Sequence, residues 1–201
     1  TGTPLAPLLR EAGLRPEAVD VQFTGADHGI ERGVEQDYAR GLAVAESLRD
    51  EVLLAYEING QPLPPQHGFP VRLVVPGWYG MAQVKWLTSV SVLDQPFTGF
   101  QNEIAYRYLT TEDGPSEPIT RIQPRALMAP PGFPDFMSRS RIVDAGQVRL
   151  QGRAWSGWAP ISSVEVSVDG GQTWKAAELD PPGEPWAWRR WSRSSQARSE
   201  T

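Results

Sequence analysis

The chain has 201 residues, of which 40% are hydrophobic and 21% charged, and a formal net charge of −5 at pH 7. That length and composition are typical of a globular protein with one or two domains, and the negative charge argues against a general nucleic-acid or acidic-membrane binder. The absence of cysteine excludes disulfides and thiolate metal ligands from these residues, and the presence of only two histidines disfavours a histidine-based zinc cluster.

A helix and a strand are expected near the start of the chain. Thr3 and Pro4 can begin a helix through the leucines of "LAPLL", and Gly13 can end it. Apolar and polar residues alternate in "VDVQF" (19–23), which predicts a strand that ends at "TGADHG". Residues 27–41 are polar and contain glycine, so we expect a surface loop there.

Three strands are predicted in the middle of the chain. The first is "VLLAYEI" (52–58), which Asn59 and Gly60 follow as a strong hairpin turn. The second is "VRLVVP" (71–76), whose composition predicts burial on both faces. The third is "VKWLTSVSVLD" (84–94).

The second part of the chain reads as all-β. A loop-like stretch, "EDGPSEPI" (112–119), places a domain boundary near Pro118 and predicts domains over 1–118 and 119–201. The alternating "QVRLQGRAW" and the hairpin turn at residues 169–171 suggest an immunoglobulin-like β-sandwich. Only four or five strands can be counted after residue 118, where such a sandwich needs about seven, so we expect a truncated sandwich. The fold class is α+β, mainly β.

The stretch "HGFPVRLVVPGWYGMAQVKWL" (67–87) brings three basic residues close to an apolar strand. A buried guanidinium such as that of Arg72 is costly unless it is paired or meets an anion. Arg72 could instead bend out to solvent, His67 could be a loop residue, and the stem of Lys85 could cover Trp86. Three glycines in the stretch allow a ligand to approach the backbone, so the pattern also predicts a pocket for a phosphate or another oxyanion.

The longer stretch "LLAYEINGQPLPPQHGFPVRLVVPGWYGMAQVKWL" resembles the sulfite oxidase family of molybdopterin enzymes. The resemblance extends to "VQFTGADHG" upstream and to "RAWSGWAPISSVEVSVDGGQTW" downstream, and covers about residues 3–191. The downstream motif resembles the family's carboxy-terminal dimerisation domain. The likeness implies a partial mixed α+β molybdopterin-binding domain over 1–118, followed by part of an immunoglobulin-like dimerisation domain over 119–201.

The resemblance also implies roles for single residues. The residues that match cofactor-binding positions are Asp27, His67, Arg72, Gln83, Val84 and Lys85. Arg72 further matches a position near the oxyanion substrate, which gives it a catalytic role. Tyr106, in "NEIAYRY", falls at the spacing of the family's active-site tyrosine, and Tyr108 is a competitor for that position.

The sequence departs from the family at the metal. The family binds molybdenum through a cysteine thiolate that lies upstream of the matched region, and this chain has no cysteine. We therefore expect a fragment of a longer enzyme, in which the isolated chain retains no molybdenum and oxidises no sulfite.

The same resemblance implies the partners. They are a small oxyanion substrate, the molybdopterin cofactor, a second copy of the chain and a separate electron acceptor such as a cytochrome, since no haem-attachment motif is present. Neither a nucleic acid nor a membrane is expected as a partner. The compartment stays open between bacterial periplasm and cytoplasm.

Three alternatives remain. One is a nitrate reductase-type molybdenum enzyme, which shares "HGFPVR" and "VKWL", and another is a non-catalytic dimerisation or binding module. For that module, carbohydrate stacking could use the tryptophans, although we favour core and interface packing for them: Trp155, Trp158, Trp174, Trp186, Trp188 and Trp191. Hydrolysis by paired carboxylates is disfavoured, because Glu31, Glu35 and Asp37 read as a solvated charge run and no nucleophile supports Asp27 and His28 as a dyad.

Overall fold

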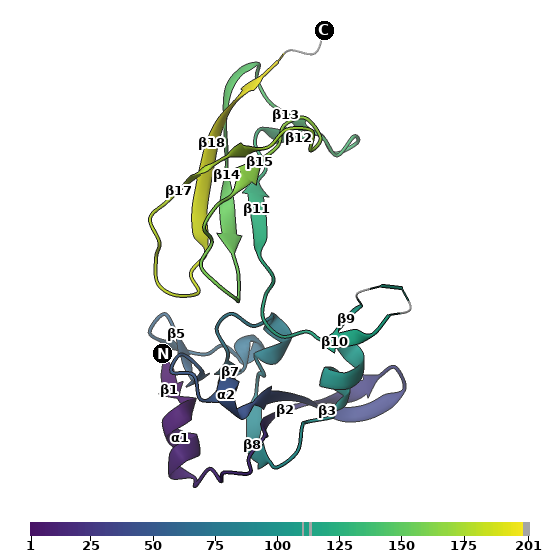
Figure 1. Ribbon diagram of the computed structural model, residues 1–201, viewed down its shortest axis with the longest axis vertical. Coiled ribbons are helices and arrows are strands. Elements are labelled where there is room, and N and C mark those ends of the chain that lie inside the picture. Colours follow the sequence, from purple (N-terminus) through teal and green to yellow (C-terminus); the bar gives the residue numbers. More distant parts are fainter. Residues whose placement is uncertain (110, 113, 199–201) are drawn as a thin grey trace. The chain divides into compact units, whose positions relative to one another are not determined.

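The computed structural model describes residues 1–109, 111–112 and 114–198, and it divides into two compact units, Thr1–Thr120 and Arg121–Thr201 (Figure 1). Both units consist mainly of β-strands, with a few short helices in the first, which confirms the α+β, mainly β, fold class. Asp113, in the loop predicted over 112–119, lies outside the described residues, as do the last three residues of the chain. Among the described residues, no helix is both long and apolar enough to cross a membrane.

Two antiparallel sheets of three strands form the centre of the first unit, with strand orders β1-β4-β7 and β3-β2-β8. Two short hairpins, β5-β6 and β9-β10, accompany them. The strands of this unit are β1 (Gly2–Pro4), β2 (Asp20–Glu31), β3 (Val34–Ala43), β4 (Leu53–Ala55), β5 (Glu57–Ile58), β6 (Gln61–Pro62), β7 (Arg72–Val74), β8 (Leu87–Leu93), β9 (Arg107–Leu109) and β10 (Ser116–Pro118). Its helices are α1 (Leu5–Glu11), α2 (Val44–Ser47), the 3₁₀-helices η1 (Pro65–His67) and η2 (Gly80–Ala82), and the π-helix η3 (Gln101–Ala105).

The predicted amino-terminal helix is confirmed. Helix α1 begins after Pro4 and ends before Gly13, whose positive φ of 84° allows the chain to turn away. Its buried leucines join one core with residues of both sheets, as apolar residues at helical spacing must when the helix covers a sheet. The buried members of this core are Leu5, Leu9, Val21, Phe23, Leu42, Val52, Leu73, Val75, Trp78, Ala82 and Val84.

The surface loop predicted over residues 27–41 is wrong, because these residues form a long β-ribbon. Strand β2 continues past "TGADHG" to Glu31, turns at Arg32 and Gly33, which both have positive φ, and returns as β3. Near the turn both strands are largely exposed, so their sequence lacks the alternation of apolar and polar residues that identifies a strand. Main-chain pairing, with a register shift between Thr24 and His28, holds this part of the ribbon together.

The predicted strands in the middle of the chain exist but are shorter. The Asn59-Gly60 turn is confirmed: both residues have positive φ and they join β5 to β6. In and after β7, Leu73 and Val75 are fully buried while Arg72 is only half-buried, so one face of this strand lies in the core and the other lines the candidate site.

The second unit contains a four-stranded antiparallel sheet of order β11-β14-β18-β17 and two short pairs, β12-β13 and β15-β16. Its strands are β11 (Arg125–Ala129), β12 (Phe133–Pro134), β13 (Arg141–Ile142), β14 (Gly146–Trp155), β15 (Glu165–Val166), β16 (Lys175–Ala176), β17 (Glu178–Leu179) and β18 (Arg189–Ala197). The strand predicted at "QVRLQGRAW" is β14, and it pairs along its length with β18 (Figure 1). The buried core of this unit is Leu150, Ala154, Val164, Val166 and Trp191.

Candidate functional site

The basic residues of the predicted pocket converge on one turn of the first unit. Helix η1 ends at Gly68, which has a φ of +102°. Arg72 Nη1 donates to the carbonyl oxygen of His67 at 3.1 Å, and Lys85 Nζ donates to that of Gln66 at 3.3 Å. A Cβ atom on Gly68 would lie 2.9 Å from Lys85 Cβ and 3.2 Å from Arg72 Cβ, so only glycine allows this approach. The exposed His67 ring belongs to the same turn.

Trp86 holds the lysine and the turn together. Its indole Nε1 donates to the carbonyl oxygen of Pro65 at 2.7 Å, and Lys85 Nζ lies 4.2 Å from the centre of its ring. Trp86 adopts this position with a φ of +48°, an uncommon backbone conformation for a large side chain. The Lys85 ammonium therefore lies over the indole and is also hydrogen-bonded to the turn.

Arg72 is held without neutralising its charge. Its Nη2 donates to the carbonyl oxygen of Gln83 at 3.2 Å, and its Nε is buried with no partner among the described residues. Burial lowers the pKa of this guanidinium, because water is removed from the charged form. A half-buried arginine bonded to carbonyl dipoles, with a donor still free, fits an anionic ligand.

Gln83 and Val84 support this cluster from behind. The Gln83 side chain accepts from the Val75 amide at 2.7 Å and donates to the Val75 carbonyl at 2.8 Å, which locks it onto the backbone. Val84 is fully buried and its carbonyl accepts from Leu73 N at 2.8 Å. Side-chain contact of either residue with a cofactor is thus disfavoured, and their main effect is to fix Arg72 and Lys85.

Asp27 approaches the cluster from strand β2. A Cβ atom added to Gly25 would contact both Asp27 Oδ1 and the carbonyl oxygen of Lys85, so these two atoms lie over the same glycine. Asp27 Oδ1 is buried and has no hydrogen-bond partner among the described residues. The structure therefore brings together Asp27 and the basic turn, which are 40 or more residues apart in sequence.

Tyr106 follows the π-helix η3 and lies against Arg40 of strand β3. The Arg40 guanidinium carbon is 5.7 Å from the centre of the Tyr106 ring. Arg40, 1% exposed, donates through Nη1 to the Gln101 carbonyl oxygen, and its Nη2 lies 3.5 Å from that of Ile119. Ile119 N in turn donates to Tyr106 O at 2.9 Å. The buried arginine thereby holds the start of the segment that carries Tyr106, and π-helices of this kind often occur at functional sites.

Tyr38 completes this group. Its hydroxyl donates to the Met81 carbonyl oxygen at 2.6 Å, and burial raises its pKa to about 12, while the nearby Arg40 acts in the opposite direction. Burial lowers the pKa of Arg40 itself. The competitor Tyr108 lies elsewhere in the unit, with its hydroxyl donating to that of Tyr79 at 2.8 Å.

Sequence reasoning missed both Tyr38 and Arg40, because they fell in the supposed loop. The available signal was the alternation of "DYARGLA" (37–43), in which Arg40 and Leu42 share a face. Nearer the turn, the His28 ring nitrogens lie 2.8 Å from Asp37 Oδ1 and 3.2 Å from Glu35 Oε1, all exposed. These hydrogen bonds raise the pKa of His28, and the one with Asp37 has a larger effect than the one with Glu35.

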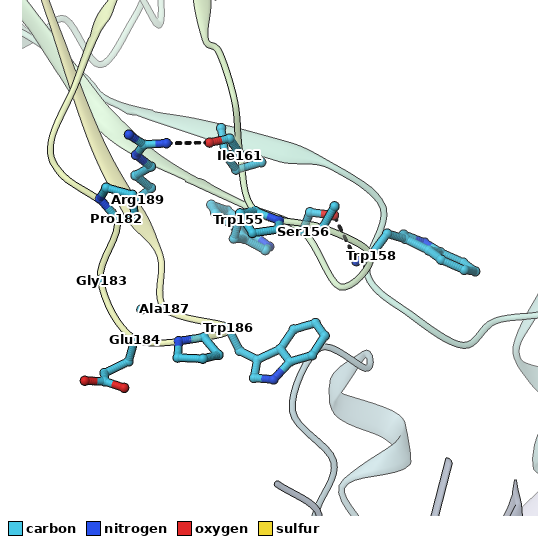
Figure 2. Close-up of a pocket in the computed structure, with 13 residues that line it drawn as sticks. Trp155, Ser156, Trp158, Ile161, Pro182, Gly183, Glu184, Trp186, Ala187 and Arg189 are labelled. Atoms are coloured by element: carbon cyan, nitrogen blue, oxygen red, sulfur yellow. Dashed lines mark hydrogen bonds between the residues drawn. The ribbon is translucent and has the colours of Figure 1, made fainter. Parts of the chain in front are cut away.

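The second unit contains an aromatic pocket of about 330 Å³ (Figure 2). Trp155, Trp158 and Trp186 line it, but Figure 2 shows the Trp158 indole directed away from the other two. Trp155 stacks on Trp188 at 4.2 Å, so one of its faces is already covered. Of the six tryptophans considered for carbohydrate stacking, only Trp191 is buried in the core of the described second unit, at 3% exposure. These tryptophans thus divide between packing and exposure.

Within the part of the chain that the structure describes, no group of three or more histidine or acidic side chains could hold a metal ion. Arg72 and Lys85, whose charges no carboxylate neutralises among the described residues, have the chemistry that a phosphorylated anion requires.

Two family profiles match the chain. The profile described as oxidoreductase molybdopterin binding domain matches residues 1–101, and that described as Mo-co oxidoreductase dimerisation domain matches residues 125–199. All the predicted cofactor residues lie within the first match, while Tyr106 lies just beyond it.

Individual relatives agree with the profiles. The mitochondrial sulfite oxidase of Mus musculus is 38% identical over 215 aligned positions, covering 99% of this chain and 38% of that protein. Nitrate reductase [NADH] 1 of Arabidopsis thaliana is 31% identical, covering 95% of this chain and 23% of that protein. The crystal structure of the sulfane dehydrogenase SoxCD from Paracoccus pantotrophus has a TM-score of 0.80 at 30% identity and covers 98% of this chain and 47% of that chain. The chain therefore spans less than half the length of each of these relatives.

Proposed function

The chain belongs to the sulfite oxidase family of molybdopterin-binding oxidoreductases, and from this premise we propose that it is part of an enzyme that transfers oxygen to sulfite. In the proposed reaction, sulfite and water give sulfate, two protons and two electrons. The molybdenum cofactor supplies the oxygen transfer and the redox chemistry when it is bound. The residues of this chain bind and orient the cofactor and the anion.

The observation that carries the proposal is that Arg72 and Lys85 both pack against Gly68 and donate to carbonyl oxygens of the turn that contains His67. The cofactor's phosphate is the proposed ligand of this turn, because a cationic cluster with a free Arg72 donor attracts an oxyanion strongly in a partly dry site. Asp27 would accept a hydrogen bond from the pterin. Gln83 and Val84 are proposed to act through the backbone that they fix.

Tyr106 is the proposed catalytic tyrosine, with Arg72 as the residue near the substrate. Arg40 holds the Tyr106 segment from behind, which favours Tyr106 over Tyr108, whose hydroxyl is bonded to that of Tyr79. A phenol hydroxyl beside the substrate can donate to a substrate oxygen or to water.

The metal ligand is not supplied by these residues. The chain has no cysteine, so a molybdenum thiolate ligand would have to come from outside the 201 residues. We propose that this chain acts as a fragment of the enzyme and is inactive in isolation. Dimer formation through residues 125–199 and electron transfer to a separate acceptor such as a cytochrome complete the proposal.

The test uses the complete gene product, made in a host that synthesises the cofactor. We expect sulfite-dependent reduction of an artificial electron acceptor and no nitrate-dependent oxidation of a reduced dye. Arg72→Met should lower both the bound molybdopterin and the turnover, and the exposed Arg15→Met is the matched control. Nitrate reduction without sulfite oxidation would favour the nitrate reductase alternative, which the similarity to the nitrate reductase of Arabidopsis thaliana supports. A cofactor-free dimer with neither activity would favour the binding module.

A further inference from the structure

A side-chain amide joins the start of the π-helix η3 to strand β3. Asn102 Oδ1 accepts a hydrogen bond from Gly41 N at 3.3 Å, and Asn102 Nδ2 donates to the Gly41 carbonyl oxygen at 3.2 Å. One side chain thus binds both main-chain polar groups of one strand residue. The orientation of the amide is fixed as well, because a flipped amide would place donor against donor and acceptor against acceptor.

Strand β3 needs such a partner at Gly41. It is an edge strand of the sheet with order β3-β2-β8, so one of its sides has no neighbouring strand. Main-chain N–H and C=O groups at a covered edge must find partners outside the sheet. The edge is covered here, since a Cβ atom on Gly41 would collide with the side chain of Phe97. The Asn102 amide therefore takes the place of a strand at this residue.

The amide contact lies beside the contact that Arg40 makes. Arg40 and Gly41 are consecutive residues of β3. They bind Gln101 and Asn102, which are consecutive residues at the start of η3. A single hydrogen bond leaves a helix free to rotate about it, whereas three at adjacent points fix both the position and the orientation of the first turn of η3.

The other end of this segment is fixed as well. Tyr106 directly follows η3, and its carbonyl oxygen accepts a hydrogen bond from Ile119 N at 2.9 Å. Arg107 Nε, on the next residue, donates to Ser116 Oγ at 2.6 Å. About one turn of a π-helix separates Asn102 from Tyr106, so a shift of the first turn displaces Tyr106 relative to the sheet.

We propose that Asn102 is a positioning residue for the reaction, which holds the Tyr106 hydroxyl at the substrate by fixing η3 to Gly41. This inference rests on the proposed function, in which the Tyr106 hydroxyl donates to a substrate oxygen or to water. Asn102 itself touches neither the substrate nor the cofactor. Its loss should therefore act on turnover through Tyr106.

The experiment measures kcat and KM for sulfite in the complete gene product with its cofactor bound. Asn102→Leu removes both hydrogen-bonding groups at similar volume, and Asn102→Ala leaves room for a water molecule to satisfy Gly41. Ile104→Ala truncates an exposed side chain of the same helix and is the matched control. Each variant is also made in the Tyr106→Phe background, which lacks the hydroxyl.

We expect each Asn102 variant to lower kcat about 10- to 100-fold with a smaller change in KM, because a misplacement of about 1 Å has an effect of this size. The control should keep the kcat of the wild type. In the Tyr106→Phe background the Asn102 variants should lower kcat by less than about threefold, since the hydroxyl on which Asn102 acts is already absent. Losses that multiply in the double variants would indicate a general structural role and overturn the inference.

A second measurement needs no turnover. In NMR spectra of the 201-residue chain with labelled tyrosine, the Asn102 variants should shift the ring signals of Tyr106, assigned through Tyr106→Phe, and leave those of Tyr56 in place. Exchange of the Gly41 amide hydrogen should accelerate up to about tenfold, because its acceptor is lost. The amide spectrum shows whether each variant folds, and Asn102→Ala decides if Asn102→Leu does not fold. Unchanged Tyr106 ring signals would overturn the inference.

The outcomes separate the inference from the proposed function. A kcat that falls in Tyr106→Phe but not in the Asn102 variants overturns the inference and leaves the proposed function intact. An unchanged kcat in Tyr106→Phe overturns the inference together with the catalytic role of Tyr106. If the wild type reduces nitrate and oxidises no sulfite, the proposed function fails and the same comparison made with nitrate decides the inference. Absence of both activities overturns both.

Discussion

Arg40→Met is the substitution that most directly probes how the fold positions Tyr106. Arg40 is buried, has no carboxylate partner among the described residues, and donates to the Gln101 carbonyl at the start of η3. Its Nη2 reaches Ile119 O at 3.5 Å, too long to contribute much. Methionine fills a similar volume but removes the charge and these hydrogen bonds.

The expected magnitude follows from two opposing terms. Losing the hydrogen bond to Gln101 O costs about 1.5–3 kcal/mol, since its donor is charged. Removing a buried guanidinium relieves a desolvation cost of several kcal/mol, so the global free energy of unfolding should change little. Stability is instead lost locally in the segment that carries Tyr106, where local unfolding should become about 10- to 100-fold more frequent. A displacement of about 1 Å at Tyr106 would lower turnover about 100-fold.

Two assays separate these terms. Hydrogen exchange of the Ile119 amide, which donates to Tyr106 O, should accelerate in Arg40→Met, while urea unfolding of the chain stays near the wild type. In the complete gene product, kcat for sulfite should fall more than KM rises. Arg40→Lys keeps the positive charge but lacks the planar set of guanidinium donors, so it should recover part of kcat. An unchanged exchange rate at Ile119, or a loss of kcat that only tracks global unfolding, would refute the reasoning.

Three further substitutions or measurements test the site. Gly68→Ala should displace Lys85 and weaken phosphate binding about tenfold in calorimetry. Gly80→Ala is the control, because no atom lies within 4 Å of the added Cβ, and it should leave the affinity unchanged. Equal affinities of the two variants would contradict the close packing of Lys85 against Gly68. Burial raises the pKa of Tyr38 from 10 to about 12, so the stability that this tyrosine contributes is complete below pH 10 and is lost as the pH rises through 12. In a titration followed by tyrosinate absorbance at 295 nm, Tyr38→Phe should remove a tyrosine that ionises late, and an unchanged curve would contradict the burial of Tyr38. The purified 201-residue chain should retain no molybdenum by mass spectrometry of the metal, and one atom per chain would show that no thiolate is needed.

Local signals in the sequence were sufficient for some elements. The Asn59-Gly60 turn is set by two residues that tolerate positive φ, so the dipeptide alone predicts it. Helix α1 likewise depends on neighbouring residues, from its apolar spacing to Gly13. The "HGFPVR" and "VKWL" motifs located the basic turn, because Arg72 and Lys85, one from each motif, both pack against Gly68.

The ribbon and its buried arginine could not be predicted in the same way. The carbonyl oxygen that accepts the hydrogen bond of the buried Arg40 lies 61 residues away in the sequence, and no local pattern predicts such a partner. The distal part of β2-β3 is exposed on both faces, which removes the alternation that identifies strands.

The way the cations are held is compatible with the proposed binding of an anion by a chain of net charge −5. Arg40, Arg72 and Lys85 each donate to backbone carbonyls, and no salt bridge joins them to a carboxylate in the described part of the chain. A carbonyl dipole fixes the direction of a cation without cancelling its charge, whereas a carboxylate would neutralise it. At physiological salt the overall negative field is screened beyond about 8 Å, so within that range the positive cluster dominates. Because these groups are oriented before a ligand arrives, little reorganisation is needed when an oxyanion binds.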